Sequence, residues 1–198
     1  MEISNSISVV SRQSSKVSVN STSSGEIGWE DNGGTFNTTG YFNNNLTAPG
    51  IIFSAATYSS FHFDPVLIAK DQIIASATFA PYMVSDVGTG KAVKINAQKV
   101  VDAPLPDNGS NKPSSMTGTF TTAVLELNNA ALDVTGEQSW DVTAIIQEIV
   151  NQSSWASGNA INLIMSNDGA TGSNYAQIAM IGHGSNNGSP LTIVHTPR

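Results

Sequence analysis

Apolar and polar residues alternate along most of the chain, and this period of two predicts β-strands. Phe61 and Phe63 alternate with polar neighbours, as do the apolar residues of 93 to 101 and of 119 to 127. Further strands are expected within 51 to 84, 161 to 165, 175 to 181 and 191 to 195, separated by turns rich in Gly, Asn and Pro. The pattern predicts an all-β, jelly-roll-like sandwich of about eight to ten short strands.

One stretch has a helical period instead. Its apolar residues form a single stripe, and they are Val142, Ile145, Ile146, Ile149 and Val150. Asp141 stands where an N-cap belongs, with Trp140 and Ile145 placed as a hydrophobic staple. We expect one amphipathic helix over about 141–152, packed on the sandwich, with Trp140 and Trp155 in the core at its two ends. The off-stripe residues are expected to face water, and they are Gln147, Glu148, Asn151 and Gln152.

The first quarter of the chain differs from the rest. Residues 1–24 hold sparse apolar residues among Ser and Asn, which predicts one or two strands or an arm that becomes ordered against a neighbouring chain. Residues 25–50 are rich in Gly and Asn. The predicted division is therefore 1–50, an N-terminal arm and loop-rich segment, and 51–198, a β-sandwich domain.

Charge and composition narrow the class of partner. The net charge is −7 with scattered Lys and Arg, which argues against nucleic acid. No apolar run is long enough to span a membrane, and the absence of cysteine excludes disulfides and thiolate metal sites. The first residues lack the pattern of a signal peptide, so we expect export by another route, prior removal of a signal, or release by lysis.

The order of motifs resembles a known family. FHFDPVLIAKDQIIASATF is followed by TGTFTTAVLEL, by DVTAIIQEIVNQSSWASGNAINLIM and by SPLTIVHT. Roughly residues 61 to 195 resemble the DNRLRE-like or CBM-like C-terminal β-sandwich modules of secreted bacterial proteins and some phage structural proteins. The chain departs from the family at Ala69, Asp71 and Leu127, where Pro, Gly and Trp are usual. The resemblance implies a fold and carries no catalytic residue.

Candidate catalytic motifs all have simpler interpretations. Residues 87 to 92, VGTGKA, look like part of a phosphate loop, but Ser85 and Ala92 stand where a glycine and a hydroxyl belong, so a hairpin loop is favoured. His183 lies beside Ser185 without a nucleophile elbow, and the histidines lack zinc-ligand spacing. Glu26, Glu30 and Asp31 are close in sequence within a glycine-rich loop. We expect no enzymatic activity and no cofactor.

Two kinds of ligand remain open. Turns at Asp31, Asp107 and Asp168 could supply oxygen ligands to a structural calcium ion, and each is also an ordinary β-turn. Trp29, Tyr41 and Phe42 are the candidate ligand-binding residues, since exposed rings stack on sugars and Asn43 to Asn45 lie near. The alternative is that these rings cover one end of the sandwich or a subunit contact.

The leading functional hypothesis is a non-enzymatic structural protein of a bacteriophage virion, such as a capsid decoration, tail or fibre component. It would form homo-oligomers or bind other virion proteins. The low charge, the Ser, Asn, Gly and Thr-rich surface and the N-terminal arm motivate it. The first alternative is a stand-alone carbohydrate-binding module of a secreted protein that binds glycans, and the second is a hydrolase with a cryptic site.

Overall fold

The computed structural model of the chain describes nine stretches of sequence. These are residues 14–19, 27–30, 34–37, 51–52, 58–87, 90–116, 119–169, 175–178 and 189–197. At some positions inside strands, Trp29 among them, only the backbone is described.

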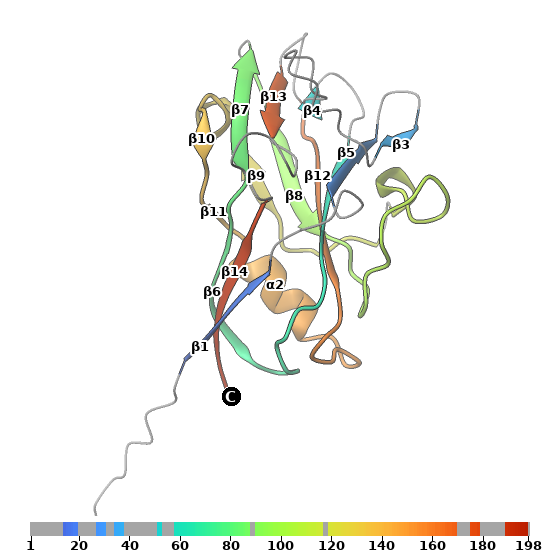
Figure 1. The fold of residues 1–198 in the computed structure, drawn as a ribbon, viewed down its shortest axis with the longest axis vertical. Coiled ribbons are helices and arrows are strands. Elements are labelled where there is room, and N and C mark those ends of the chain that lie inside the picture. Colours follow the sequence, from blue (N-terminus) through green and yellow to red (C-terminus); the bar gives the residue numbers. More distant parts are fainter. Residues whose placement is uncertain are drawn as a thin grey trace, which may run out of the picture.

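Strands dominate the described part of the chain (Figure 1). The strands before residue 100 are β1 (Ser15–Val19), β2 (Ile27–Glu30), β3 (Phe36–Asn37), β4 (Ile51–Ile52), β5 (Tyr58–Phe63), β6 (Ile73–Phe79), β7 (Tyr82–Val87) and β8 (Val93–Ala97). The later strands are β9 (Leu125–Leu127), β10 (Gly136–Glu137), β11 (Trp140–Asp141), β12 (Ile161–Asn167), β13 (Tyr175–Ile178) and β14 (Leu191–Thr196). The helices are the 3₁₀ helix η1 (Pro113–Met116), α1 (Asn129–Leu132) and α2 (Thr143–Val150).

The strands form three antiparallel sheets. Their orders are β1-β14-β6-β11, β10-β7-β13-β4 and β3-β2-β5-β12-β8-β9. The six-stranded sheet faces the sheet β1-β14-β6-β11, because the ring centroid of Phe79 from β6 lies 4.8 Å from that of Phe61 and 6.1 Å from that of Phe63, both on β5. Met83 of β7 and Ile178 of β13 belong to the same buried cluster, so the third sheet packs on this core too. The predicted all-β sandwich with an amphipathic helix packed on it is confirmed.

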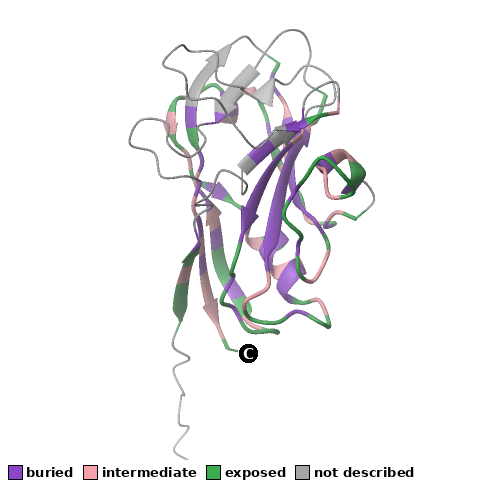
Figure 2. Ribbon diagram, turned by 45° about the vertical axis from the view of Figure 1, so that its right-hand side comes forward, coloured by how far each residue is buried: buried purple, intermediate pink, exposed green. Residues whose placement is uncertain are grey.

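The core lies between these layers. Leu163 and Met165 of β12 are buried beside Phe61 and Phe63, and Ile193 of β14 belongs to the same cluster. Figure 2 shows the buried strands of the six-stranded sheet as one continuous band. Burial of apolar area at about 25 cal/mol per Å² therefore holds the two layers together.

Helix α2 packs its apolar stripe into this core, as predicted. Val142, Ile145, Ile146 and Ile149 are each at most 2% exposed. Its bounds differ from the expected 141–152, because Trp140 and Asp141 pair with β6 as strand β11. Asp141 is thus outside the helix, and its Oδ1 accepts from the N–H of Thr143 at 2.9 Å. Trp140 and Trp155 are both buried, as expected.

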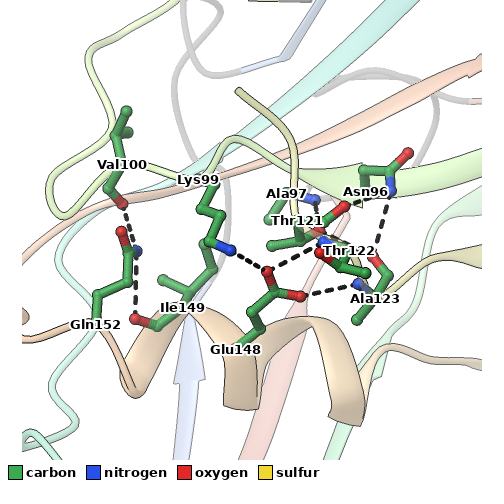
Figure 3. Close-up of polar contacts among 10 residues, drawn as sticks. All are labelled: Asn96, Ala97, Lys99, Val100, Thr121, Thr122, Ala123, Glu148, Ile149 and Gln152. Atoms are coloured by element: carbon green, nitrogen blue, oxygen red, sulfur yellow. Dashed lines mark hydrogen bonds and ion pairs between the residues drawn. The ribbon is translucent and has the colours of Figure 1, made fainter. Parts of the chain in front are cut away.

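The polar residues of α2 do not simply face water. Glu148 accepts from the N–H groups of Thr122 at 3.0 Å and Ala123 at 2.8 Å, and from Lys99 Nζ at 2.8 Å (Figure 3). Gln152 Nε2 donates to the carbonyl of Val100 at 3.0 Å. This corrects the expectation that the off-stripe side chains are solvent-facing, since only Asn151 among them is exposed.

On its other side, α2 covers an edge of β6. Gln147 Oε1 accepts from Ile74 N–H at 2.8 Å, and Thr143 Oγ1 accepts from Ala77 N–H at 2.8 Å. Side chains of the helix therefore take the place of a neighbouring strand. Because unpaired edges invite aggregation, this cover protects the sheet.

One expected strand is shorter than predicted. The strand expected over 119 to 127 is regular only at β9, because Asn96 Nδ2 and Glu148 bind the backbone groups of 121 to 123. The short helices η1 and α1 lie on either side of this segment and were not predicted. Among the described residues, no helix has the length and apolar character needed to cross a membrane.

The described part of the predicted arm pairs within its own chain. Residues 15–19 form β1 and pair with β14, and Val19 joins the core. This corrects the expectation that the arm needs a neighbouring chain to become ordered, because β14 supplies both hydrogen bonds and apolar cover. Residues 1–13 lie outside the described residues. The division at residue 50 stays a prediction.

Candidate functional site

The candidate site lies at the end of the sandwich that holds β3 and β4, away from α2 (Figure 1). Strand β3 belongs to the six-stranded sheet and β4 to the sheet β10-β7-β13-β4. The residues between β3 and β4, which include Tyr41 and Phe42, lie outside the described residues. The described part of the candidate site consists of β2, β3 and the segment 102–116.

Gly28 and Phe36 define how β3 folds back on β2. Gly28 is buried, and a Cβ atom at this position would overlap Cζ of the Phe36 ring. The ring therefore lies directly over the glycine backbone, and only a residue without a side chain permits this approach. Phe36 is 2% exposed, which makes the hairpin β2–β3 a packed element.

Glu30, the last residue of β2, binds the segment 102–116. Its Oε2 accepts from Ser114 N–H at 2.8 Å and its Oε1 from Ser114 Oγ at 2.5 Å, while Lys112 Nζ lies 3.9 Å from Oε1. Lys112 also donates to the Gly34 carbonyl at 3.2 Å. Glu30 is buried, and a buried carboxylate needs such donors. We call Glu30, Lys112 and Ser114 the Glu30 clasp.

The turn at Asp107 adds a second attachment to the same hairpin. Asp107 Oδ1 accepts from the N–H groups of Gly109 at 2.7 Å and Asn111 at 3.1 Å. The hydrogen bond from Gly109 is the main cause that lowers the pKa of Asp107. The turn presents Asn108, whose Oδ1 accepts from the N–H of Phe36. The segment 102–116 is thereby fixed to both β2 and β3.

A buried polar layer continues from this corner along the outer face of the six-stranded sheet. His62 Nδ1 lies 2.6 Å from Asn162 Oδ1, and Asn162 Nδ2 donates to Gln98 Oε1 at 3.0 Å and to the Pro104 carbonyl at 2.9 Å. Since the Asn162 amide already donates twice, its oxygen accepts and His62 carries a proton on Nδ1. This network joins β5, β12 and β8 to the covering segment.

The structure places the predicted ligand-binding residues only in part. Trp29 lies in β2, and its backbone pairs with Ser59 and Asn37, between Gly28 and Glu30. Tyr41 and Phe42 lie outside the described residues. The three are close to the Glu30 clasp along the chain, and their role in binding stays a prediction.

The three predicted calcium residues lie in different surroundings. Asp31 is outside the described residues, Asp107 serves its own turn, and Asp168 Oδ1 lies 3.6 Å from Lys94 Nζ. In the described stretches, no three His, Cys, Asp or Glu side chains gather in a way that could hold a metal ion. A calcium site stays a prediction.

Two of the remaining candidate groups, Lys91 and His195, are engaged within the fold. Lys91, from the loop that looks like part of a phosphate loop, has a fully buried side chain, and its Nζ donates to Asp133 Oδ1 at 3.1 Å. This contact ties the start of β8 to the end of α1. His195 Nδ1 lies 3.2 Å from Gln72 Oε1, and His183 is outside the described residues.

Sequence reasoning missed the roles of Ser114, Asn108 and Asn162. Each is a polar residue whose hydrogen-bond partner is distant in the sequence. Ser114 lies 84 residues from Glu30, Asn108 lies 72 residues from Phe36, and Asn162 lies 100 residues from His62. The available signal was Glu30 itself, a charged residue that follows the apolar residues Ile27 and Trp29 in the sequence. Such a position calls for a buried partner, but the sequence does not say which.

Comparisons with known proteins assign no family to the chain. No protein-family model matches the chain, and no curated protein sequence matches it significantly. One similar solved structure is that of a carbohydrate-binding module specific for non-crystalline cellulose (CBM28), at 13% identity and a TM-score of 0.33. The match covers 71% of this chain and 65% of that module. The resemblance to DNRLRE-like modules stays a prediction.

Proposed function

We propose that this protein is a non-catalytic β-sandwich module that binds carbohydrate at the end of the sandwich that holds β3 and β4. The binding surface would comprise the rings of Trp29, Tyr41 and Phe42 with the amides of the Asn-rich stretch beside them. Aromatic rings offer apolar faces that match those of a pyranose ring, and amides bind its hydroxyl groups.

The observation that carries this proposal is the Glu30 clasp. It fixes the hairpin β2–β3 to the segment 102–116 through a buried carboxylate. This hairpin contains Trp29 and precedes Tyr41 and Phe42 in the sequence. Binding residues held on a rigid base lose less conformational freedom when a ligand binds. We infer that the clasp preorganises the support on which Trp29, Tyr41 and Phe42 bind the ligand.

The two carboxylates described near this end, Glu30 and Asp107, favour a binding role over hydrolysis. Glu30 receives two hydrogen bonds from Ser114, and Asp107 receives its own from Gly109 and Asn111. Oxygens engaged in this way stabilise loops, and a general acid or base needs an oxygen that reaches substrate. We therefore propose a module without turnover.

The virion hypothesis and a virion or secreted location stay predictions. One observation that motivated the virion hypothesis was an arm free to bind a neighbour, and the described part of that arm, β1, pairs with β14 of its own chain. No contact of the described residues favours a capsid, tail or fibre role over glycan binding.

The test is affinity electrophoresis of the intact chain in gels containing soluble glucans, mannans, xylans, galactans or alginate. We expect retardation by at least one polysaccharide. The variant Tyr41→Ala/Phe42→Ala should lose it, and Trp29→Ala should lose it if its melting curve shows a folded protein. Tyr82→Ala is the matched control, since Tyr82 is an exposed aromatic residue at the start of β7, outside the hairpin β2–β3 and the segment 102–116. No retardation in any gel, or loss only in the Tyr82 variant, would refute the proposal.

A further inference from the structure

The two edges of the sheet β1-β14-β6-β11 differ in how they are covered. At one edge, α2 follows β11, and Thr143 and Gln147 accept from the backbone N–H groups of β6. At the other edge, β1 pairs with β14 on one side only. Ser15, Lys16 and Ser18 are exposed, and Figure 2 shows β1 at the margin of the molecule. In the described part of the chain, no strand pairs with the outer side of β1, so its outward backbone groups have no strand partner there.

The β1 edge has the properties of a strand that can accept another strand. Its register with β14 runs without a bulge from Ser15 to Val19, and it contains no proline. Val19 is buried and Val17 is half-buried, which keeps the strand in place on its own domain. An edge strand that is regular and uncovered is a template for further pairing.

We propose that the β1 edges of two copies of this chain pair antiparallel, which joins their two sheets into one across a two-fold axis. Self-pairing fits this strand because a register centred on Val17 places Lys16 of each copy opposite Ser18 of the other. No like charges then meet, and Ser15 lies opposite Val19. The occupant of the edge is thus a second copy, and the inference is independent of the glycan proposal.

The size of this contact sets its strength. Five residues from each copy form an interface well below the roughly 1,000 Å² of stable complexes. The dimer is therefore weak and forms as the protein concentration rises. A weak dimer of a binding module would still strengthen attachment to a repeating ligand through two-site binding.

A charged residue at position 18 should change the affinity of the dimer in a direction that depends on the sign of the charge. Ser18→Glu puts a carboxylate opposite Lys16 twice in the dimer, and Ser18→Lys puts two lysine pairs there instead. Cross-strand pairs of this kind should tighten or weaken the dimer by about two- to thirty-fold. Sedimentation velocity from about 10 µM to about 1 mM covers the range for an interface this small.

The control is the same pair of changes at Ser154, an exposed residue in the turn after α2. Because each chain carries −7, a lysine placed anywhere reduces repulsion between copies and a glutamate increases it. The general effect at Ser154 thus has the opposite sign to the local effect at Ser18. Tighter association for Ser18→Glu and weaker association for Ser18→Lys supports the β1 pairing. A wild-type chain that stays monomeric throughout, or Ser18 variants that follow the Ser154 variants, overturns it.

Discussion

At the scale of single residues, the contact between Gly28 and Phe36 shows how one missing side chain shapes the candidate site. We expect Gly28→Ala to destabilise the fold by about 1–3 kcal/mol, because its Cβ would overlap a buried ring. Chemical denaturation measures this loss. In a double-mutant cycle, the same change should cost much less in the background Phe36→Ala, where the ring is absent. An equal cost in both backgrounds would show that the ring contact is not the cause.

Glu148 is a second residue with a measurable role, since it joins α2 to the segment 119–123. Desolvation alone would raise the pKa of Glu148, but the hydrogen bonds from Ala123, Lys99 and Thr122 together lower it. A carboxylate with a lowered pKa stabilises the folded state above its unfolded pKa of 4.5, and this contribution is lost as the pH falls through the lower folded value.

We therefore expect Glu148→Gln to lower the free energy of unfolding by about 1–3 kcal/mol at pH 7, since it weakens hydrogen bonds to a charged group. The difference from the wild type should shrink as the pH falls below the usual pKa of glutamate. Thermal melts across this range give the comparison. Glu126→Gln, the same change at an exposed glutamate of β9, should have little effect at any pH. A deficit for Glu148→Gln that is constant with pH would contradict this account.

Residue roles were predictable where they depend on local period and not where they depend on distant partners. The stripe of Ile145, Ile146 and Ile149 follows from spacing alone, and all three are buried. The position of Gln147 on the helix is equally clear from the sequence, but its partner Ile74 lies 73 residues away. A period says which face is polar, and it does not say what that face contacts.

At the scale of elements, the turn after α2 anchors the end of the helix to the segment before β6. Trp155 is buried, and its Nε1 donates to the Ile68 carbonyl at 2.9 Å. We expect Trp155→Ala to cost about 3–5 kcal/mol in the free energy of unfolding. Trp155→Phe should cost less, about 1–3 kcal/mol, because it keeps a ring but leaves the Ile68 carbonyl without its donor. Denaturant melts that match the wild type for the alanine variant would show that the anchor is unimportant.

Strands were predicted best where both neighbours are regular strands. β12 lies between β5 and β8, and its alternation appears in the sequence from Ile161. The segment 119–124 has a similar alternation, but side chains of Asn96 and Glu148 bind its backbone and prevent a continuous ladder. Alternation of apolar and polar residues shows which side chains suit the buried face of a sheet. It does not show whether distant side chains bind the backbone groups that a neighbouring strand would otherwise pair with.

At the scale of the whole molecule, the two ends of the sandwich have separate roles in this account. Helix α2 packs in the core and covers the β6 edge, which stabilises the fold. At the end that holds β3 and β4, the Glu30 clasp fixes the hairpin β2–β3 to the segment 102–116. The fold class was readable from sequence, whereas the clasp was not, because it joins segments far apart in the chain.

The most direct test of the central claim is a nuclear magnetic resonance titration of the ¹⁵N-labelled chain with a fragment of whichever polysaccharide retards it. We expect the largest amide shifts at Trp29, Tyr41 and Phe42 and in the Asn-rich stretch beside them, with smaller shifts at Asn108 and Ser114, which support the hairpin β2–β3. The amides of α2 and β6 should stay unchanged. Shifts that instead cluster on β7 and β10, or on α2, would contradict the placement of the site.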